Sequence, residues 1–105
     1  MVRTVKYYVG LSNKDGELSE DQVNDLIKIV SDYFEAFTVY PAKGYWNRQG
    51  EKTFIIEIVD FGTPLKTFID FEDSLSAWLK ATDQECVLKL VVHSNASFIN
   101  AESDK

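Results

Sequence analysis

The clearest pattern in the chain is an amphipathic segment over residues 20–35. Apolar side chains recur at helical spacing from Val23 to Phe34, and polar side chains occupy the positions between them. Ser19 precedes this segment and Gln22 follows it by three residues, which is the spacing of a capping box. The pattern therefore predicts a helix over 20–35 with Ser19 as its cap.

Four further segments have the composition of strands, and one has the pattern of a second helix. β-Branched and aromatic residues predict strands over 3–9, 37–45, 52–59 and 86–93. Thr63 and Pro64 open the second helical pattern, with Thr63 as cap and Pro64 in the first helical position, and the pattern ends near Ala81. Pro41 cannot donate a hydrogen bond to a neighbouring strand, so we expect the strand over 37–45 at a sheet edge.

The order of these elements is strand, helix, strand, strand, helix, strand. Right-handed crossovers turn this order into an α+β fold, the ferredoxin-like βαββαβ sandwich, in which a four-stranded antiparallel sheet carries two helices on one face. The segment 52–59 is apolar on both faces except at Glu57, which favours an inner strand. A chain of 105 residues suits one domain. We assign residues 1–95 to it and residues 96–105 to a polar C-terminal tail.

The predicted sheet leaves one face without helices. We expect an apolar surface on that open face, made by Tyr8, Ile55, Val59, Val87 and Val91. Soluble monomers seldom expose a contiguous apolar surface, so we expect a homodimer that forms sheet to sheet. Two alternatives are a tail that folds over the face through Phe98 and Ile99, and a surface for a ligand or partner protein.

Composition mainly restricts the kinds of partner. The net charge of -6 disfavours binding to nucleic acid, and Tyr8 is the one aromatic placed to stack on a base.

One cysteine, Cys86, excludes an internal disulfide, and its apolar surroundings predict a buried thiol of a reducing compartment. The chain has one histidine in addition to this cysteine, which is too few ligands for structural zinc. We expect no metal or cofactor. No segment has the length of a signal peptide or membrane span, so we expect a cytoplasmic protein without membrane contact.

Acidic residues gather in and near the first helix. They are Asp15, Glu17, Glu20, Asp21, Asp25, Asp32 and Glu35. Acids early in a helix suit its positive N-terminal end, so part of this cluster is ordinary capping and solvation. The other interpretation is an acidic face that binds a basic protein partner.

A second cluster, over residues 43–48, combines two bases with two aromatic side chains. The bases are Lys43 and Arg48, and the aromatic residues are Tyr45 and Trp46. A loop of this composition is suited to binding an anion or a nucleotide. The alternative is a long hairpin whose tip is stabilised by aromatic packing.

Two single residues are candidates for chemistry. Glu57 is an isolated carboxylate in an apolar strand, where burial would raise its pKa and suit it to act as a base. The alternative is an outward Glu57 paired with Lys6 or Lys89 across the sheet. His93 is the sole histidine, and no nucleophile at a suggestive spacing accompanies it. Nothing in the sequence marks the chain as an enzyme, and we assign no catalytic residue.

Several short strings resemble a family of small uncharacterised bacterial and phage proteins, known as a domain of unknown function. The strings are Tyr8-Val9-Gly10-Leu11, Leu18-Ser19-Glu20-Asp21-Gln22, Thr38-Val39-Tyr40 and Lys43-Gly44-Tyr45-Trp46. The resemblance covers roughly residues 5–60 and implies a ferredoxin-like fold and a mobile-element origin. It implies no activity and no catalytic residues.

These observations lead to three hypotheses on function. The first is a non-catalytic, acidic binding or assembly module, dimeric, that acts on a protein partner as an accessory factor of a phage or mobile element. The second is a small-molecule or nucleotide-binding protein that uses the hairpin over 43–48. The third is a small enzyme that uses Glu57 or His93. The ligand- or partner-binding residues we expect are Tyr8, Lys43, Tyr45, Trp46, Arg48 and Glu57.

Overall fold

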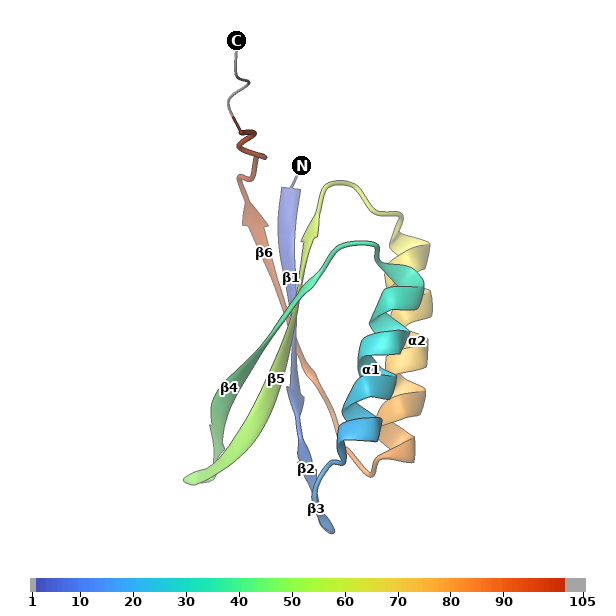
Figure 1. The fold of residues 1–105 in the computed structure, drawn as a ribbon, viewed down its shortest axis with the longest axis vertical. Coiled ribbons are helices and arrows are strands. Elements are labelled where there is room, and N and C mark those ends of the chain that lie inside the picture. The colour runs from blue at the N-terminus through green and yellow to red at the C-terminus, as the bar shows by residue number, and fades with distance from the viewer. Residues whose placement is uncertain (1, 102–105) are drawn as a thin grey trace.

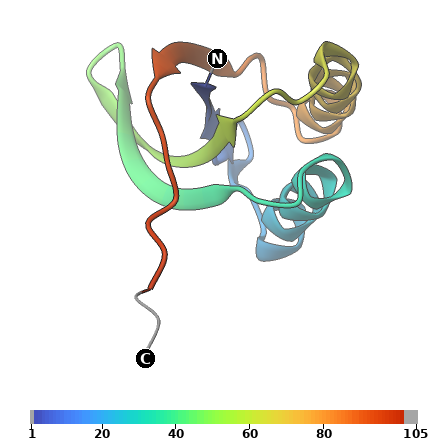
Figure 2. The same cartoon turned by 90° about the horizontal axis from the view of Figure 1, so that it is seen from above.

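The computed structural model describes residues 2–101 and consists of one sheet with two helices packed on one of its faces (Figures 1 and 2). The elements in chain order are β1 (Val2–Gly10), β2 (Ser12–Asn13), β3 (Gly16–Glu17), α1 (Glu20–Tyr33), β4 (Thr38–Trp46), β5 (Gln49–Asp60), α2 (Leu65–Ala81) and β6 (Leu88–Ser94). Apart from the two-residue strands β2 and β3, the order is βαββαβ. The α+β fold predicted from the sequence, a ferredoxin-like sandwich, is confirmed.

The four long strands form one sheet in the order β4-β5-β1-β6, with every neighbouring pair antiparallel. β5 and β1 are the inner strands, and β4, which contains Pro41, lies at an edge, as its proline predicts. Asn47 and Arg48 form the turn between β4 and β5 with φ angles of 50° and 65°. Positive φ at both central residues is typical of the tight hairpin turn whose twist matches that of the strands.

The core lies between the helices and one face of the sheet. Alternate residues of the two inner strands point into it, because successive side chains of a strand point to opposite faces. The buried apolar residues of this core are Val5, Tyr7, Val9, Phe54, Ile56 and Ile58 from the sheet, Leu18 before α1, Leu26 and Val30 from α1 with its cap residue Phe34, and Phe68, Phe71, Leu75 and Trp78 from α2. Neither helix of the described chain is long and apolar enough to cross a membrane.

Both helix starts can be compared with the sequence pattern. The capping box of α1 is present: Gln22 N donates to Ser19 Oγ over 3.2 Å, and Ser19 N donates to Gln22 Oε1 over 2.8 Å. α2 begins one residue later than predicted, since Pro64 is the cap rather than the first helical residue, and no side chain caps the helix. Thr63 instead donates its backbone N–H to Asp60 over 2.6 Å.

The register of β6 corrects two of the residues predicted on the open face. Val91 pairs directly with Val5, whose side chain is buried beneath the helices, and directly paired residues project to the same face. Val87 precedes β6 and packs against the core. Leu88, Leu90 and Val92 face the open side in their place, because β6 is apolar on both faces and its alternation alone does not fix its orientation.

For the end of the chain, the expectation of a buried Cys86 and the alternative of a tail that folds over the open face are both wrong. Cys86 is exposed rather than buried, because it lies in the segment before β6 and not within the strand. Phe98 and Ile99 do not cover the open face: the ring of Phe98 stacks on Phe61 with 5.5 Å between the ring centres, and Ile99 is 96% exposed.

Residues 95–101 carry no regular secondary structure and lead away from the body, at the end opposite the β4–β5 hairpin (Figure 1). The start of β1 lies at the same end as this segment, and residues 102–105 of the predicted tail lie outside the described residues.

A partly buried ion pair between Arg3 and Asp60 fixes the start of β1 to the end of β5. Arg3 Nε donates to Asp60 Oδ2 over 2.6 Å, and the backbone N–H groups of Gly62 and Thr63 donate to the other carboxylate oxygen. Burial by itself would raise the pKa of Asp60, but these three donors outweigh it and lower the pKa to about 2. The carboxylate therefore stabilises the turn that leads from the sheet into α2.

We expect Asp60→Asn to lower the free energy of unfolding by about 2 to 3 kcal/mol at neutral pH, because charged hydrogen bonds are lost from a buried site. Since folding lowers this pKa, the contribution of Asp60 is present above the unfolded pKa and disappears as the pH falls toward 2. Urea unfolding of both proteins at several pH values would check this. A destabilisation that stayed constant down to pH about 2 would contradict the assignment to ionised Asp60.

Candidate functional site

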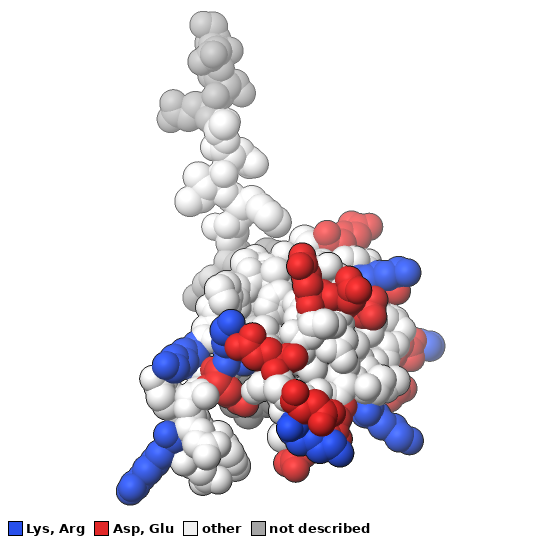
Figure 3. Space-filling model, turned by 60° about the horizontal axis from the view of Figure 1, so that its bottom comes forward, with Lys and Arg blue, Asp and Glu red and all other residues white. Residues whose placement is uncertain are grey.

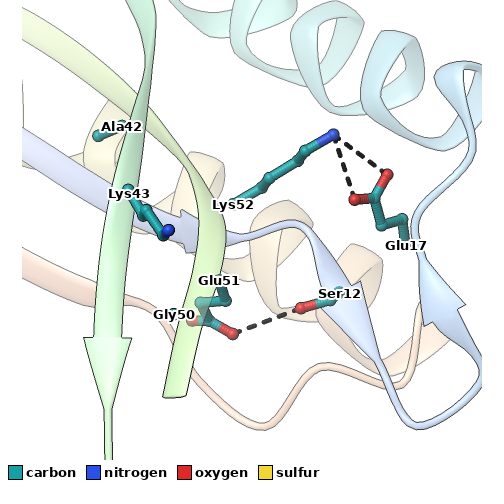
Figure 4. A pocket seen from close by; sticks show the side chains of 7 residues that line it. All are labelled: Ser12, Glu17, Ala42, Lys43, Gly50, Glu51 and Lys52. Carbon is teal, nitrogen blue, oxygen red and sulfur yellow. Dashed lines mark hydrogen bonds and ion pairs between the residues drawn. The ribbon is translucent and has the colours of Figure 1, made fainter. Parts of the chain in front are cut away.

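A hollow lies at the end of the molecule that carries the β4–β5 hairpin. It has a volume of about 420 Å³ and is open to solvent on one side. Its lining comes from β2, β3, β4 and β5 and consists of Ser12, Glu17, Ala42, Lys43, Gly50, Glu51 and Lys52 (Figure 4). Small-molecule sites commonly have volumes of roughly 300–1,000 Å³, so this end hollow is large enough for a ligand of metabolite size.

One wall of the end hollow is the small β2–β3 hairpin, which is held by the segment after α2. Gln84 Nε2 donates to the carbonyl oxygen of Ser12 over 2.8 Å, and Asn13 Nδ2 donates to that of Thr82 over 2.9 Å. These two bonds join parts of the chain about seventy residues apart. The wall therefore depends on the complete fold rather than on local sequence.

Glu51 brings a carboxylate to this hollow. The hydroxyl of Ser12 donates to Glu51 Oε2 over 3.4 Å. A Cβ atom at Gly10 would lie 3.1 Å from Glu51 Oε1, so the missing side chain at Gly10 leaves space for the carboxylate. Glu51 is thus positioned beside β1 although it lies two residues into β5.

Positive charges flank the same hollow. Lys52 Nζ lies 3.1 Å from Glu17 Oε1, and both side chains are more than half exposed. Lys43 Nζ lies over the ring of Tyr45 at 5.5 Å from its centre. Figure 3, in which this end of the molecule comes forward, shows acidic and basic side chains interspersed over it.

A hollow lined by both signs of charge is suited to a ligand that carries both. Carboxylates attract a cationic group, while lysine ammonium groups attract a carboxylate or phosphate. The described residues contain no group of three His, Cys, Asp or Glu side chains that could hold a metal ion. The arrangement is therefore suited to binding an organic zwitterion or nucleotide-like molecule.

The structure brings four of the six residues predicted for binding to this end. Lys43 lines the end hollow, and Tyr45, two residues further along β4, projects to the same side as Lys43. Trp46 projects to the opposite side of the strand, and the two aromatic side chains are 69% and 76% exposed. Arg48 lies in the adjoining turn and is exposed. Both interpretations of this hairpin remain, since its aromatic side chains are exposed while one of its bases faces the hollow.

The other two residues predicted for binding, Tyr8 and Glu57, lie on the open face of the sheet. Glu57 Oε1 is 3.4 Å from Lys6 Nζ and 3.5 Å from the hydroxyl of Tyr40, so Glu57 has the outward, cross-strand pairing considered above. A smaller hollow of about 250 Å³ adjoins this pair. His93 pairs with Arg3, which by the alternation of β1 points to the face opposite Lys6, so the fold does not bring His93 and Glu57 together.

Four polar residues of the end hollow are not predicted from the sequence. They are Ser12, Glu17, Glu51 and Lys52. Glu17 was considered only as part of an acidic cluster. Recognising Glu51 requires the β1–β5 register, which pairs Gly10 with Thr53 and so brings Glu51 next to Ser12. The one local signal of this site in the sequence is a pair of glycines, Gly44 and Gly50. They lie on either side of the turn, next to charged residues.

Comparison with known proteins gives a match in structure but not in sequence. No protein-family model matches the chain. No curated protein matches it either. Solved structures do match, and they share its fold.

Two of the matching structures are of a phage S-adenosylmethionine (SAM) lyase. The one in complex with S-methyl-5'-thioadenosine is 20% identical with a TM-score of 0.64, and covers 87% of this chain and 80% of the lyase chain. The apo structure is 22% identical with a TM-score of 0.62, and covers 86% and 78%. At this identity the likeness shows a common fold.

Two bacterial proteins match as well. A DUF3240 family protein from Shewanella baltica is 10% identical with a TM-score of 0.61, and the match covers 92% of this chain and 97% of the other. CutA from Synechococcus elongatus is 14% identical with a TM-score of 0.50, and the match covers 91% and 79%. The expected likeness to small bacterial and phage proteins, one of them from a family of unknown function, is confirmed at the level of the fold.

We expect Lys52→Ala to change the free energy of unfolding by less than about 1 kcal/mol, because an exposed ion pair with Glu17 contributes little to stability. The lysine is then available for a role other than holding the fold. Chemical unfolding of the variant beside the wild type measures the difference. A loss above about 2 kcal/mol would contradict this and identify the Lys52–Glu17 pair as structural.

Proposed function

We propose that the protein binds S-adenosylmethionine in the end hollow and releases S-methyl-5'-thioadenosine from it, as a lyase. The observation that carries the proposal is the coincidence of a metabolite-sized hollow of mixed charge with a fold shared with a phage SAM lyase over 87% of the chain. This proposal develops the second of the hypotheses drawn from the sequence, a nucleotide-like ligand at the hairpin over 43–48. It departs from the expectation of a non-catalytic protein.

The charges around the hollow fit the chemistry of this substrate. SAM carries a positive sulfonium, and its amino-acid end carries an ammonium and a carboxylate. The carboxylate of Glu51 is suited to attract the sulfonium, and Lys43 or Lys52 to attract the substrate carboxylate. The exposed ring of Tyr45, on the side of β4 that carries Lys43, is suited to stack on adenine.

The reaction needs little from the protein beyond binding and orientation. The bond between sulfur and the γ-carbon of the amino-acid chain breaks, and its electron pair stays on sulfur, which becomes the neutral thioether. The substrate carboxylate attacks the γ-carbon in the same step and closes a lactone, so no water, metal or redox cofactor is consumed. A site that holds the amino-acid chain of SAM in a folded conformation, with its carboxylate near the γ-carbon, gains the advantage of an intramolecular reaction.

We expect Glu51→Gln to weaken SAM binding by on the order of 10-fold, and to lower thioadenosine release by a similar factor at SAM concentrations well below saturation, because the variant loses the negative charge that attracts the sulfonium while keeping the shape of the side chain. Chromatography of purified protein incubated with SAM measures the release. Binding of S-methyl-5'-thioadenosine, which is neutral at sulfur, should change by less than about threefold in the same variant.

Glu35→Gln is the matched control for this experiment, since Glu35 is exposed and does not line the end hollow. It should leave both release and binding unchanged. Wild-type protein that neither binds SAM in calorimetry nor releases the thioadenosine would sink the proposal. Equal losses in both glutamate variants would show an effect of net charge rather than of the site.

A second candidate function keeps the first hypothesis drawn from the sequence, an acidic accessory module of a phage or mobile element that docks on a basic protein. Its support is the first helix, where no ion pair among the described residues involves Glu20, Asp21, Asp25 or Asp32. The sheet-to-sheet homodimer belongs to the same hypothesis, with Tyr8, Ile55 and Val59 on the open face by their register, although Ile55 is only 7% exposed. The Lys6–Glu57 pair interrupts this face, to which Leu88, Leu90 and Val92 of β6 add apolar side chains.

This second candidate predicts salt-dependent binding to an arginine-rich peptide. Asp25→Asn combined with Asp32→Asn should weaken such binding about tenfold, because two unpaired charges are removed from one helix face. Fluorescence anisotropy with a labelled peptide measures it. Asp70→Asn serves as control, since Asp70 already pairs with Lys66. Binding that the double substitution leaves intact would exclude the first helix as the docking surface.

A further inference from the structure

Another hollow lies on the open face of the sheet, beside the first half of β1. It has a volume of about 250 Å³ and shares no lining residue with the end hollow. Its lining comes from β1, β5 and β6 and consists of Thr4, Lys6, Glu57, Leu90, Val92 and Ser94. Sites for drug-sized ligands have volumes of roughly 300–1,000 Å³, so this open-face hollow is suited to a smaller molecule.

The charged pair of the open-face hollow makes long contacts. Lys6 Nζ lies 3.4 Å from Glu57 Oε1, and the hydroxyl of Tyr40 donates to the same oxygen over 3.5 Å. Hydrogen bonds between an ammonium and a carboxylate are normally about 2.7–2.9 Å long. The ammonium and the carboxylate therefore lie side by side without a short bond between them.

This looseness does not follow from exposure to solvent. The side chains of Lys6 and Glu57 are 30% and 28% exposed. In two other ion pairs of the described residues neither side chain is more than 37% exposed, and in both the charged atoms are 2.6 Å apart; they are Arg3–Asp60 and Lys89–Glu72. Charges that have lost part of their hydration need close partners to offset the loss. Lys6 and Glu57 are thus suited to take further partners from a ligand.

The rest of the open-face hollow is apolar along one side and ends at two hydroxyl groups. Leu90 pairs directly with Lys6, and Val92 pairs directly with Thr4, so both apolar side chains lie next to β1 on the open face. They are 41% and 45% exposed. Thr4 Oγ1 lies 3.1 Å from Ser94 Oγ, which donates to the carbonyl oxygen of Val92 over 3.2 Å. A molecule with its charged end at Lys6 can therefore lay an apolar chain along β6.

We propose that the open-face hollow binds a free α-amino acid with an aliphatic side chain. Such a molecule carries an ammonium and a carboxylate on one carbon, so its two charges can meet an anion and a cation that lie side by side. The ligand ammonium donates to Glu57, the ligand carboxylate accepts from Lys6, and the aliphatic side chain covers Leu90 and Val92. A ligand with a single charge would satisfy one member of the pair and leave the other unmatched. This inference does not depend on the ligand of the end hollow.

A titration of the full chain with L-leucine, followed by two-dimensional NMR of the backbone amides, tests the proposal. We expect saturable binding with a dissociation constant on the order of 1 mM, as suits so small a ligand. Isocaproate has the same carbon skeleton without the ammonium, and isoamylamine has it without the carboxylate. Each should bind at least about tenfold more weakly than L-leucine, because one charged contact is lost.

The position of the shifted amides separates this site from the end hollow. Binding of L-leucine should move the signals of β1 and β6 around Lys6 and Leu90 most. Shifts that gather instead around Glu51 and Lys52 would place the amino acid in the end hollow and overturn the proposal. So would the absence of saturable shifts at roughly twenty times the expected dissociation constant, or an isocaproate that binds as tightly as L-leucine.

Substitutions in the pair give a second test. Lys6→Met and Glu57→Gln nearly keep the size of each side chain and remove its charge, and each should weaken L-leucine binding at least about tenfold. Lys66→Met and Glu35→Gln are the matched controls, since both residues are exposed and neither lines the open-face hollow; they should leave binding unchanged. Circular dichroism of each variant confirms that it folds. Binding that survives in folded Lys6→Met and Glu57→Gln proteins rules out the charged pair as the recognition element.

Discussion

The packing of Phe71 against three other aromatic rings determines how the sheet and the helices meet. Its ring, from α2, makes edge contacts with Tyr7 of β1 at 5.2 Å, with Phe34 at the end of α1 at 5.3 Å, and with Tyr33 at 6.0 Å. These contacts join the central strand to both helices at a fully buried point. The hydroxyl of Tyr7 still finds a partner, since it donates to Glu72 over 2.7 Å, and burial together with this bond raises the pKa of the phenol. Because both helices are held to one face here, the other face and the long hairpin are left for interaction.

The features proposed to carry function lie beyond this packed region. β5 has twelve residues, and the part of it that precedes Thr53 extends past the core together with the end of β4. The end hollow and the exposed aromatic residues belong to this extension. The stability of the core is therefore separate from the chemistry of the hollow, which allows substitutions at Glu51 or Lys52 to test function without unfolding the protein.

Sequence pattern alone was sufficient for the arrangement of the main elements. The capping box at Ser19, the proline in β4 and the two-sided apolar character of β5 each predict a feature that the structure has. The orientation of β6 was not predictable in the same way. Alternation assigns Val87 and Val91 to one face and Leu88 and Leu90 to the other, but with apolar residues on both, only the pairing of Val91 with Val5 decides which face meets the helices. The end hollow was less predictable still, since it depends on the β1–β5 register and on hydrogen bonds from Gln84 and Asn13 to distant carbonyl groups. Its hairpin residues, Lys43 and Tyr45, were recognisable because charge and aromatic character are concentrated locally.

Both ends of the described chain lie at the same pole, away from the hairpin. A purification tag or a fluorescent protein joined to either end would project from the far pole and leave the end hollow clear. Surface immobilisation through such a tag would present every molecule with its hairpin toward the solution. The same geometry allows the module to be joined in tandem to another domain, since a linker at either end meets neither the helices nor the exposed aromatic tip.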